Sequence, residues 1–435
     1  MNNKHSSANS ISYWSSTSVD APYCETLKDK VSADVVVIGG GFSGLSTALH
    51  LRERGIETTV IEASELCTEA SARSCGLVIP ALKKEDPELI SARYGEHHGQ
   101  KMITMMRDSA DYTFDLIKKY NINCDAEQTG WIQPAHSNYH AKKALKLVKH
   151  WQRYDADVEY LDRDQVRTKL GGDFYKAAWK ANSGGTLHPK SYAHGLANTV
   201  IALGGNIFTN SPVISIEKHD SGWFVKTSEG EVSAKKIVIA TNATTQKNLW
   251  KNLSKSIIPA SFYQLVSQPL SEQERSVILP GREAMSDMQN DLHFARFDRY
   301  NRLITGGALI TERNWRVKLE KIAKSRMEKL FPDLPSLELT NHWSGSVGMT
   351  MDFFPKLLSL APGVFCWMGC NGRGVSLTTN MGRVMADVIE EKPESSLPLP
   401  IEELKGIPFN QILTTVSLYS LIYYRAEDYG YRKFS

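Results

Sequence analysis

The hydrophobic positions near the start of the chain change their spacing at a run of glycines. Residues 35–38 are continuously apolar and β-branched, which predicts a strand buried on both faces of a parallel sheet. Apolar residues then recur at helical spacing from Leu45 to Leu51, and Gly55 is the expected glycine stop of that helix. Residues 57–63, ETTVIEA, predict a second strand that ends at Glu62. This segment therefore predicts a complete βαβ unit.

The rest of the chain alternates between helical and strand-forming patterns. Residues 87–150 are largely helical in spacing, and a further helix is predicted over about 189–203. Residues 206–242 predict short strands with turns at 220–222 and 229–230, and residues 251–339 predict an antiparallel sheet with a hairpin around 298–301. Residues 363–391 then repeat the opening order of strand, glycine-rich loop and helix. The fold class is therefore α/β, with one parallel sheet rebuilt from distant segments.

Composition narrows the classes of function. Lys and Arg total 51 against 48 for Asp and Glu, and this balance gives no indication of a nucleic-acid partner. The six cysteines lack paired spacing and the histidines form no known metal-ligand pattern, so we expect neither disulfides nor a metal site. The polar first 30 residues lack the order of a secretory signal, which favours a cytoplasmic protein.

The apolar run at 412–424 is shorter than the roughly 18–20 residues needed to span a bilayer. We expect a helix there that either packs on the protein or makes a peripheral contact with a membrane or a partner.

The glycines at the first strand end carry the candidate chemistry. In the GxGxxG pattern, Gly39 permits a tight turn, Gly41 lets the backbone approach a pyrophosphate, and Gly44 lets helix and strand pack closely. The helix start adds free N–H groups and a positive dipole end. Glu62 lies where a carboxylate accepts hydrogen bonds from ribose hydroxyls, and it would repel the phosphate of NADP. The unit by itself does not distinguish NAD from FAD.

Several further motifs occur in a fixed order along the chain. They include SYW at 12–14, VVIGGGFSGLSTALHL at 36–51, EASARSCG at 69–76, IVIATNA at 237–243, and GCNGRGVSLTTNMGRVMA at 369–386. Together they resemble the D-amino-acid oxidase superfamily of FAD enzymes (the glycine and sarcosine oxidase-like proteins), most closely its bacterial γ-glutamylputrescine oxidase branch. The resemblance spans nearly the whole chain.

The resemblance implies a Rossmann-like FAD-binding domain of the GR2 type and a second, substrate domain with a mainly antiparallel sheet plus helices. We expect the FAD-binding domain to comprise 33–86, 187–245 and 340–392, and the substrate domain 87–186 and 246–339. An N-terminal arm (1–32) and a C-terminal tail with the apolar helix (393–435) flank them. The implied FAD-binding residues are Gly39, Gly41, Phe42, Ser43, Gly44, Glu62, Ala63, Ser71, Ala72, Arg73, Ser74, Val213, Ala240, Thr241, Gly372, Arg373, Gly374 and Val375.

The chain also departs from the family pattern. Relatives commonly show ASGRNGG where this chain has ASARSCG, so Ala72, Ser74 and Cys75 change the surroundings of the flavin. Some relatives attach FAD through a cysteine at the place of Gly345, and the glycine here predicts non-covalent FAD. Arg373 could equally be a solvated loop charge.

The expected reaction is oxidation of a C–N bond in an amino acid or amine, possibly γ-glutamylated, to an imine by hydride transfer to flavin. Oxygen is the expected acceptor. Alternatives are a quinone-linked amino-acid dehydrogenase and a non-catalytic flavin-binding subunit. The expected catalytic residues are Arg296, which matches a family arginine that grips the substrate carboxylate, with His293 and Trp343 in the same pocket. Arg296 could instead be a strand-face charge paired with Asp298.

Overall fold

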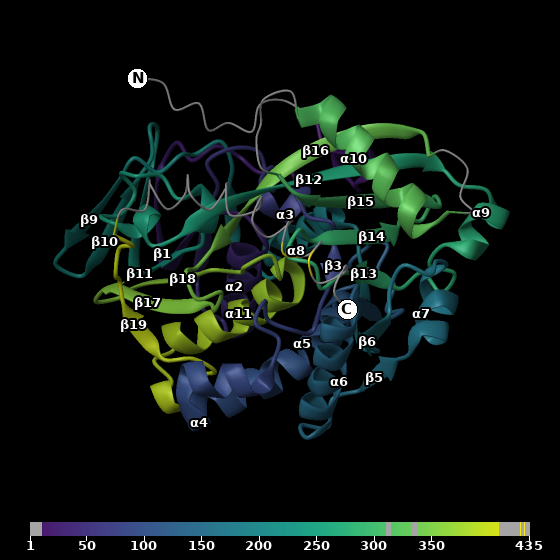
Figure 1. Ribbon diagram of the computed structural model, residues 1–435. Helices are drawn as coiled ribbons and strands as arrows, with labels where there is room; N and C mark the ends of the chain where they lie inside the picture. Colours follow the sequence, from purple (N-terminus) through teal and green to yellow (C-terminus); the bar gives the residue numbers. More distant parts are fainter. Residues whose placement is uncertain (1–10, 310–314, 333–336, 409–426, 428–429, 431–435) are drawn as a thin grey trace.

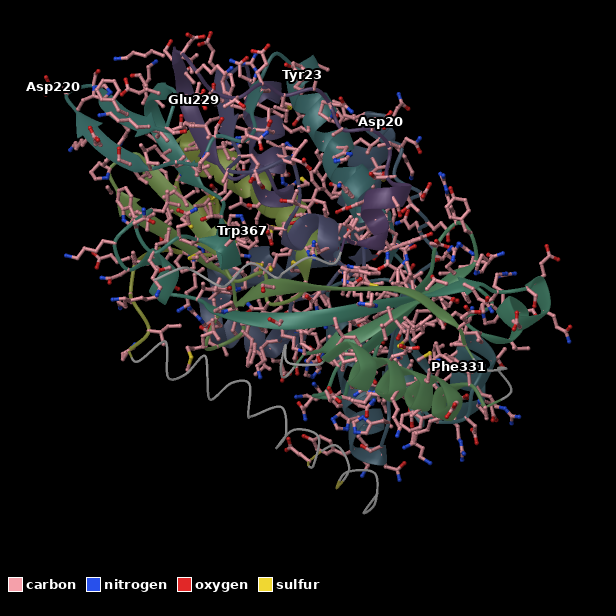
Figure 2. All side chains as sticks on the ribbon, turned by 90° about the horizontal axis from the view of Figure 1, so that it is seen from above. Asp20, Tyr23, Asp220, Glu229, Phe331 and Trp367 are labelled. Atoms are coloured by element: carbon pink, nitrogen blue, oxygen red, sulfur yellow. The ribbon has the colours of Figure 1, made fainter. Side chains whose placement is uncertain are left out.

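The computed structural model describes residues 11–309, 315–332, 337–408, 427 and 430 of the chain. Two large sheets dominate it (Figure 1), with the nine-stranded sheet on the left of that view and the eight-stranded sheet on the right. Seen from above, Asp220 and Phe331 mark opposite ends of the molecule (Figure 2). Within the described residues no helix combines the length and apolarity needed to cross a bilayer. The apolar run 412–424 lies outside them.

The first sheet carries the predicted βαβ unit. Strand β1 (Lys30–Ile38) leads through helix α2 (Phe42–Glu53) to β2 (Thr58–Ile61), and the two strands pair in parallel. The parallel core of the sheet has the order β8-β2-β1-β11-β18, and antiparallel strands complete it. Besides β1 and β2, the strands of this sheet are β8 (Asn206–Phe208), β9 (Ser215–His219), β10 (Gly222–Lys226), β11 (Glu231–Ile239), β17 (Lys356–Ala361), β18 (Val364–Met368) and β19 (Ile401–Glu403).

The second sheet is antiparallel except for one parallel pair, β13 with β4. Its strands, in spatial order, are β16 (Leu339–Met349), β12 (Ile258–Pro269), β15 (Arg302–Ala308), β14 (His293–Phe297), β13 (Ala284–Ser286), β4 (Trp131–Ala135), β6 (Ala177–Ala181) and β5 (Val158–Leu161). Both the Rossmann-like unit and the mainly antiparallel second sheet are therefore as predicted. Strand β16 belongs to this second sheet, although residues from 340 onward were expected in the FAD-binding domain. The domain boundaries stay a prediction.

The longer helices of the first half of the chain follow the predicted spacing, but the short helices α1, α3 and α7 were not predicted, and two helices in the second half were missed. Helices α9 and α10 fall in the region 251–339, where the alternating pattern predicted only strands. The remaining helical bounds are α1 (Tyr13–Thr17), α3 (Ala70–Arg73), α4 (Pro87–Arg107), α5 (Ser109–Lys119), α6 (Asn138–Gln152), α7 (Arg163–Leu170), α8 (Pro189–Ala202), α9 (Glu272–Val277), α10 (Trp315–Leu330) and α11 (Gly374–Ile389), with 3-10 turns at Asn242–Thr244, Leu253–Lys255 and Glu394–Ser396. A two-stranded sheet joins β3 (Leu77–Val78) and β7 (Gly185–Thr186).

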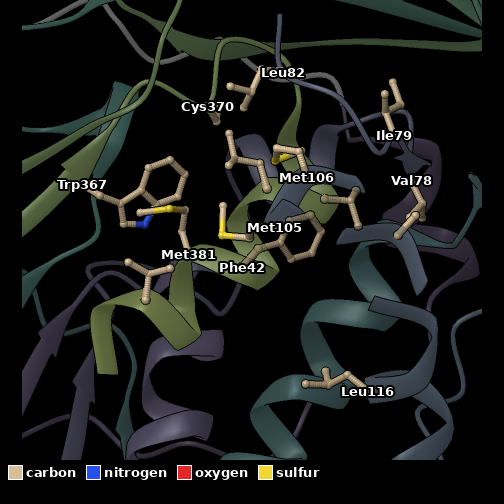
Figure 3. Packing of buried hydrophobic residues seen from close by; sticks show 14 of the residues in the cluster. Phe42, Val78, Ile79, Leu82, Met105, Met106, Leu116, Trp367, Cys370 and Met381 are labelled. Atoms are coloured by element: carbon tan, nitrogen blue, oxygen red, sulfur yellow. The ribbon is translucent and has the colours of Figure 1, made fainter. Parts of the chain in front are cut away.

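The main core lies between the two sheets and contains α2, α11, α4 and α5. Phe42, Met105, Met106 and Met381 belong to this cluster, part of which is seen in the close-up of Figure 3. Side chains from one face of the second sheet, such as Trp131, join the same cluster. The opposite face packs with residues of α7 and α10 in separate clusters. The second sheet thus has one face toward the nucleotide unit and one face away from it.

Candidate functional site

The glycine loop after β1 has the geometry that the GxGxxG pattern requires. Gly39 has φ +115°, a conformation that disfavours other residues. A Cβ atom added to Gly44 would lie 1.9 Å from the carbonyl oxygen of Gly39, so the start of α2 packs directly on the loop. A Cβ on Gly41 would lie 2.9 Å from Ser71 Oγ, which itself accepts a hydrogen bond from the Phe42 N–H at 3.0 Å. The loop is a cradle that only glycines can form.

Glu62 lies at the end of β2, directly beside this loop. Its Oε2 accepts a hydrogen bond from the Gly40 N–H at 2.7 Å, and its Oε1 accepts one from the Ser64 N–H at 3.1 Å. The Ser211 N–H donates to the Glu62 carbonyl at 2.9 Å, which brings the segment leading to Val213 to the same strand end. Ala63 is exposed next to Glu62. This is the position that a nucleotide ribose and base would occupy in a βαβ unit.

Two distant segments reach the same edge of the first sheet. The Ala240 N–H donates to the Ile38 carbonyl at 2.8 Å, which places Ala240 and Thr241 against Gly39. From the end of β18, Trp367 Nε1 donates to Ser43 Oγ at 2.6 Å, so the segment leading to Gly372 begins beside the start of α2. Because β1, β11 and β18 are parallel neighbours, their carboxyl ends lie at one edge. That edge is where ligands bind in open α/β sheets.

The loop before α11 leaves room for a bound group. A Cβ atom added to Gly372 or Gly374 would meet no atom within 4 Å. Arg373, between them, is only 6% exposed, and its Nε is buried without a hydrogen-bond partner. Its guanidinium stands over the ring of Trp131 at 5.1 Å, and burial lowers the pKa of this arginine. The interpretation of Arg373 as a solvated surface charge is therefore wrong.

Helix α3 is fastened to the second sheet. Arg73 Nε donates to the Ser344 carbonyl at 2.6 Å, and the Arg73 carbonyl accepts hydrogen bonds from Trp343 Nε1, at 3.0 Å, and Gln264 Nε2. Ala72 is buried in the main core. The expected FAD-binding residues 71–74 thus lie between the glycine cradle and strands β12 and β16. Gly345 abuts them, because an added Cβ would lie 3.2 Å from Arg73 Cβ.

The fold and the three converging loops define a dinucleotide-binding α/β protein with a second sheet that covers the nucleotide edge. Residues 34–388 match the FAD dependent oxidoreductase family, DAO, and the chain belongs to this family. It is an FAD-dependent enzyme, and the empty space at Gly372 and Gly374, the glycine cradle and Glu62 fit that cofactor.

Curated relatives and solved structures agree with this assignment. The chain is 29% identical over 383 residues to the gamma-glutamylputrescine oxidoreductase of Escherichia coli (strain K12), covering 88% of this chain and 89% of that one. It is 29% identical to the probable oxidoreductase OrdL of Haemophilus influenzae, with 82% and 83% covered. The crystal structure of glycine oxidase from Geobacillus kaustophilus superposes with a TM-score of 0.71 at 19% identity, covering 86% of this chain and 100% of that one, and so shares the fold.

The three expected catalytic residues do not share one pocket. Arg296 and His293 are an odd number of residues apart on β14, so their side chains point to opposite faces of the sheet. His293 lies on the far face of the sheet. Its Nε2 is hydrogen-bonded to Thr305 at 2.8 Å, and Thr305 pairs with Ala295 on the neighbouring strand. Ala295 packs on that far face with residues of α7 and α10. Trp343 lies on the near face, in a cluster with Trp14. The grouping of His293 with the other two was wrong.

The Arg296 guanidinium donates hydrogen bonds to backbone carbonyls of the chain. Its Nε donates to the Phe297 carbonyl at 2.9 Å, and its Nη1 donates to the Leu187 carbonyl at 2.5 Å, with the Cys75 and Gly76 carbonyls at 3.4 Å. Burial without a paired carboxylate lowers its pKa, and Asp298 instead accepts a hydrogen bond from Tyr13 at 2.5 Å. This geometry is typical of a structural arginine that ties the second sheet to the loop after α3, and it does not fit an ion pair with Asp298. The role of Arg296 as a substrate ligand stays a prediction.

Sequence reasoning overlooked two groups near the site. Trp14, from the SYW motif, is fully buried and donates from Nε1 to the Ser74 carbonyl at 2.9 Å. Lys83, in the loop between β3 and α4, has a pKa lowered to about 8, chiefly by burial and then by the nearby charge of Arg373. The motif itself marked Trp14, but a lysine beside another lysine in a polar stretch gives no signal in the sequence.

Proposed function

We propose that the protein oxidises the C–N bond of a small amino acid or carboxylated amine to an imine, with FAD held non-covalently by the three loops described above. One observation carries the proposal: the near face of the second sheet closes over the Gly372–Gly374 space. Trp131 lies under the Arg373 guanidinium, and Gln264 reaches the carbonyl of Arg73. A small substrate in that space would be enclosed between the sheet and the cofactor edge.

FAD, when bound, would accept a hydride from the carbon of the C–N bond. The residues of this chain then have three tasks: to hold the cofactor, to orient the substrate and to exclude water. Gly39, Gly41 and Gly44 hold the pyrophosphate, and Glu62 holds the ribose. Trp131 and Trp343, both fully buried, provide apolar surface that keeps water from the reacting bond.

The substrate class is supported by the relatives. The gamma-glutamylputrescine oxidoreductase, at 29% identity over most of both chains, acts on an amine by its name, and glycine oxidase of Bacillus licheniformis is 23% identical over 83% of this chain. Both names designate a substrate that contains an amine. We propose oxygen as the acceptor, which would release hydrogen peroxide.

Anaerobic titration of the purified holoprotein tests this function. A panel of γ-glutamylated amines, glycine derivatives and free diamines would be added, and the visible flavin absorption followed. Loss of absorption with one class of amine, and its return with peroxide on admitting air, is the expected result. Loss that reverses only with a quinone would identify an acceptor-dependent dehydrogenase. A flavin that no amine bleaches would refute catalysis and favour a flavin-binding subunit.

A further inference from the structure

A pair of cations, the buried Arg373 and the partly buried Lys83, lies beside the proposed cofactor space. The loop that carries Lys83 runs along the start of α11, because Ser376 Oγ donates to the Ile79 carbonyl at 3.0 Å. Leu82 and Cys370, from this loop and the one after β18, belong to one buried cluster, and both are seen in Figure 3. Lys83 therefore lies close to Arg373, and each cation contributes to the electrostatic environment of the site.

Neither cation forms an ion pair within the part of the chain that the structure describes. Arg373 is 6% exposed, and its buried Nε has no partner. Lys83 has no hydrogen bond or ion pair with a described residue. The charge of the buried Glu85 carboxylate acts on both cations, and this carboxylate also pairs with Lys143 at 3.0 Å.

The next carboxylate, Asp287, is also occupied. It accepts hydrogen bonds from the Tyr175 hydroxyl at 3.1 Å and from the His293 N–H at 3.0 Å. The field at Lys83 thus comes from two further cations, Arg373 and Lys143, and from two carboxylates, Glu85 and Asp287, which other groups share. A partly buried lysine beside a buried arginine whose Nε has no partner is an environment that favours an anion from outside the chain.

We propose that Lys83 and Arg373 together bind the carboxylate of the substrate and select carboxylated amines over amines that lack one. The proposal rests on the proposed function, since it names the residues that set its substrate class. A guanidinium offers directional N–H donors to a carboxylate, and an ammonium adds a compact charge. Arg296 is less suited to this role, because its Nε and Nη1 are used by backbone carbonyls.

Binding of an unreactive anion to the holoprotein tests the pair directly. The probe is butyrate, its neutral control is butyramide, and the readout is the dissociation constant from calorimetry and from the visible flavin spectrum. Lys83→Met is expected to weaken butyrate binding about 10- to 100-fold, the range for losing one charge-assisted contact. Butyramide binding is expected to stay within about 2-fold. Lys83→Arg, which keeps the charge, is expected to retain most of the affinity.

Lys84 provides a matched control, because it is the neighbouring lysine and is exposed. Lys84→Met is expected to bind butyrate like the unmodified protein. Equal butyrate affinity in Lys83→Met and Lys84→Met would overturn the proposal. So would a loss of FAD from Lys83→Met with unchanged butyrate binding, since the charge would then serve the cofactor. Failure of every amine to bleach the flavin, with butyrate binding intact, would refute the reaction and leave the anion site standing.

Discussion

At the scale of single residues, Glu62 is the proposed link between the glycine loop and the nucleotide. Its carboxylate accepts the Gly40 N–H at 2.7 Å and is half-buried at the strand end. Glu62→Gln preserves its shape but weakens charge-assisted hydrogen bonds to the ribose, which are worth about 1.5–3 kcal/mol. We expect FAD to dissociate about 10- to 100-fold more readily, measured by flavin retained after dialysis. Glu65→Gln, at an exposed neighbouring position, is the control, and equal retention in both variants would exclude the ribose role.

Arg296 is expected to act on stability and not on substrate choice. Arg296→Met removes the donors to the carbonyls of Leu187 and Phe297, leaving buried acceptors unpaired at a cost of about 1–3 kcal/mol. The free energy of unfolding in urea measures this loss. The ratio of KM values for a carboxylated and an uncharged amine is expected to stay unchanged. A selective rise in KM for the carboxylated amine would instead restore Arg296 as the substrate ligand.

The pH dependence of anion binding depends on Lys83. Its pKa is lowered to about 8, so the ammonium is present below that pH and is lost as the pH rises through it. Asp287, with a pKa raised by burial to about 6, is already ionised over the range tested. Butyrate affinity is therefore expected to be highest below pH 8 and to fall above it. Calorimetry from pH 7 to about 10 checks this, and Lys83→Arg is expected to remove the decline because guanidinium does not titrate there.

At the scale of elements, the short helix α1 joins the second sheet to helices α3 and α8. Trp14 is fully buried, packs edge-on against Trp343 at 6.0 Å and His188 at 4.7 Å, and donates to the Ser74 carbonyl. Burial and the charge of Arg296 lower the pKa of His188 to about 3, so it serves as a neutral hydrogen-bonding group. The arm that looked peripheral in the sequence is therefore part of the core behind α3.

Trp14→Ala is expected to destabilise the protein by about 3–5 kcal/mol, because it leaves a large cavity and an unpaired carbonyl. Urea unfolding measures the change. Tyr23→Ala is the control, since Tyr23 is 85% exposed in the same arm and should change stability by less than about 0.5 kcal/mol. Similar losses in the two variants would mean that the arm is fastened by its backbone and not by Trp14.

The elements could be predicted where their pattern is local. The βαβ unit, helix α8, the turns around β10 and the hairpin of β14 and β15 all follow from spacing and glycine positions. Helix α10 was missed because its residues, WRVKLEKIAKSRMEKL, lie within a stretch read as alternating. His293 and Arg296 were predicted to share a pocket without regard to the two faces of β14. Side chains alternate between the faces of a strand, so residues three positions apart point to opposite faces.

At the scale of the whole molecule, the resemblance across distant motifs predicted the family and the cofactor. The substrate side could not be predicted in the same way, because Lys83 and Arg373 are 290 positions apart in the sequence and meet only through the packing of α11 against the loop after β3. Whether a buried charge is free or paired depends on such tertiary contacts. For this reason the sequence indicated Arg296 as a ligand of the substrate carboxylate and gave no signal for Lys83.

The convergence of three chain segments on one edge also predicts how FAD acts on the molecule. Residues 39–44, 240–242 and 370–376 are far apart in sequence but lie at the carboxyl ends of β1, β11 and β18. A single cofactor that touches all three should slow amide hydrogen exchange in all three together, and saturation at 100 times its Kd should add about 2.7 kcal/mol to stability. Exchange measured with and without FAD checks this, with the β9–β10 hairpin as an internal control. Protection confined to residues 39–44 would mean that the nucleotide is held by the βαβ unit alone, and that the loop before α11 is not part of the cofactor site.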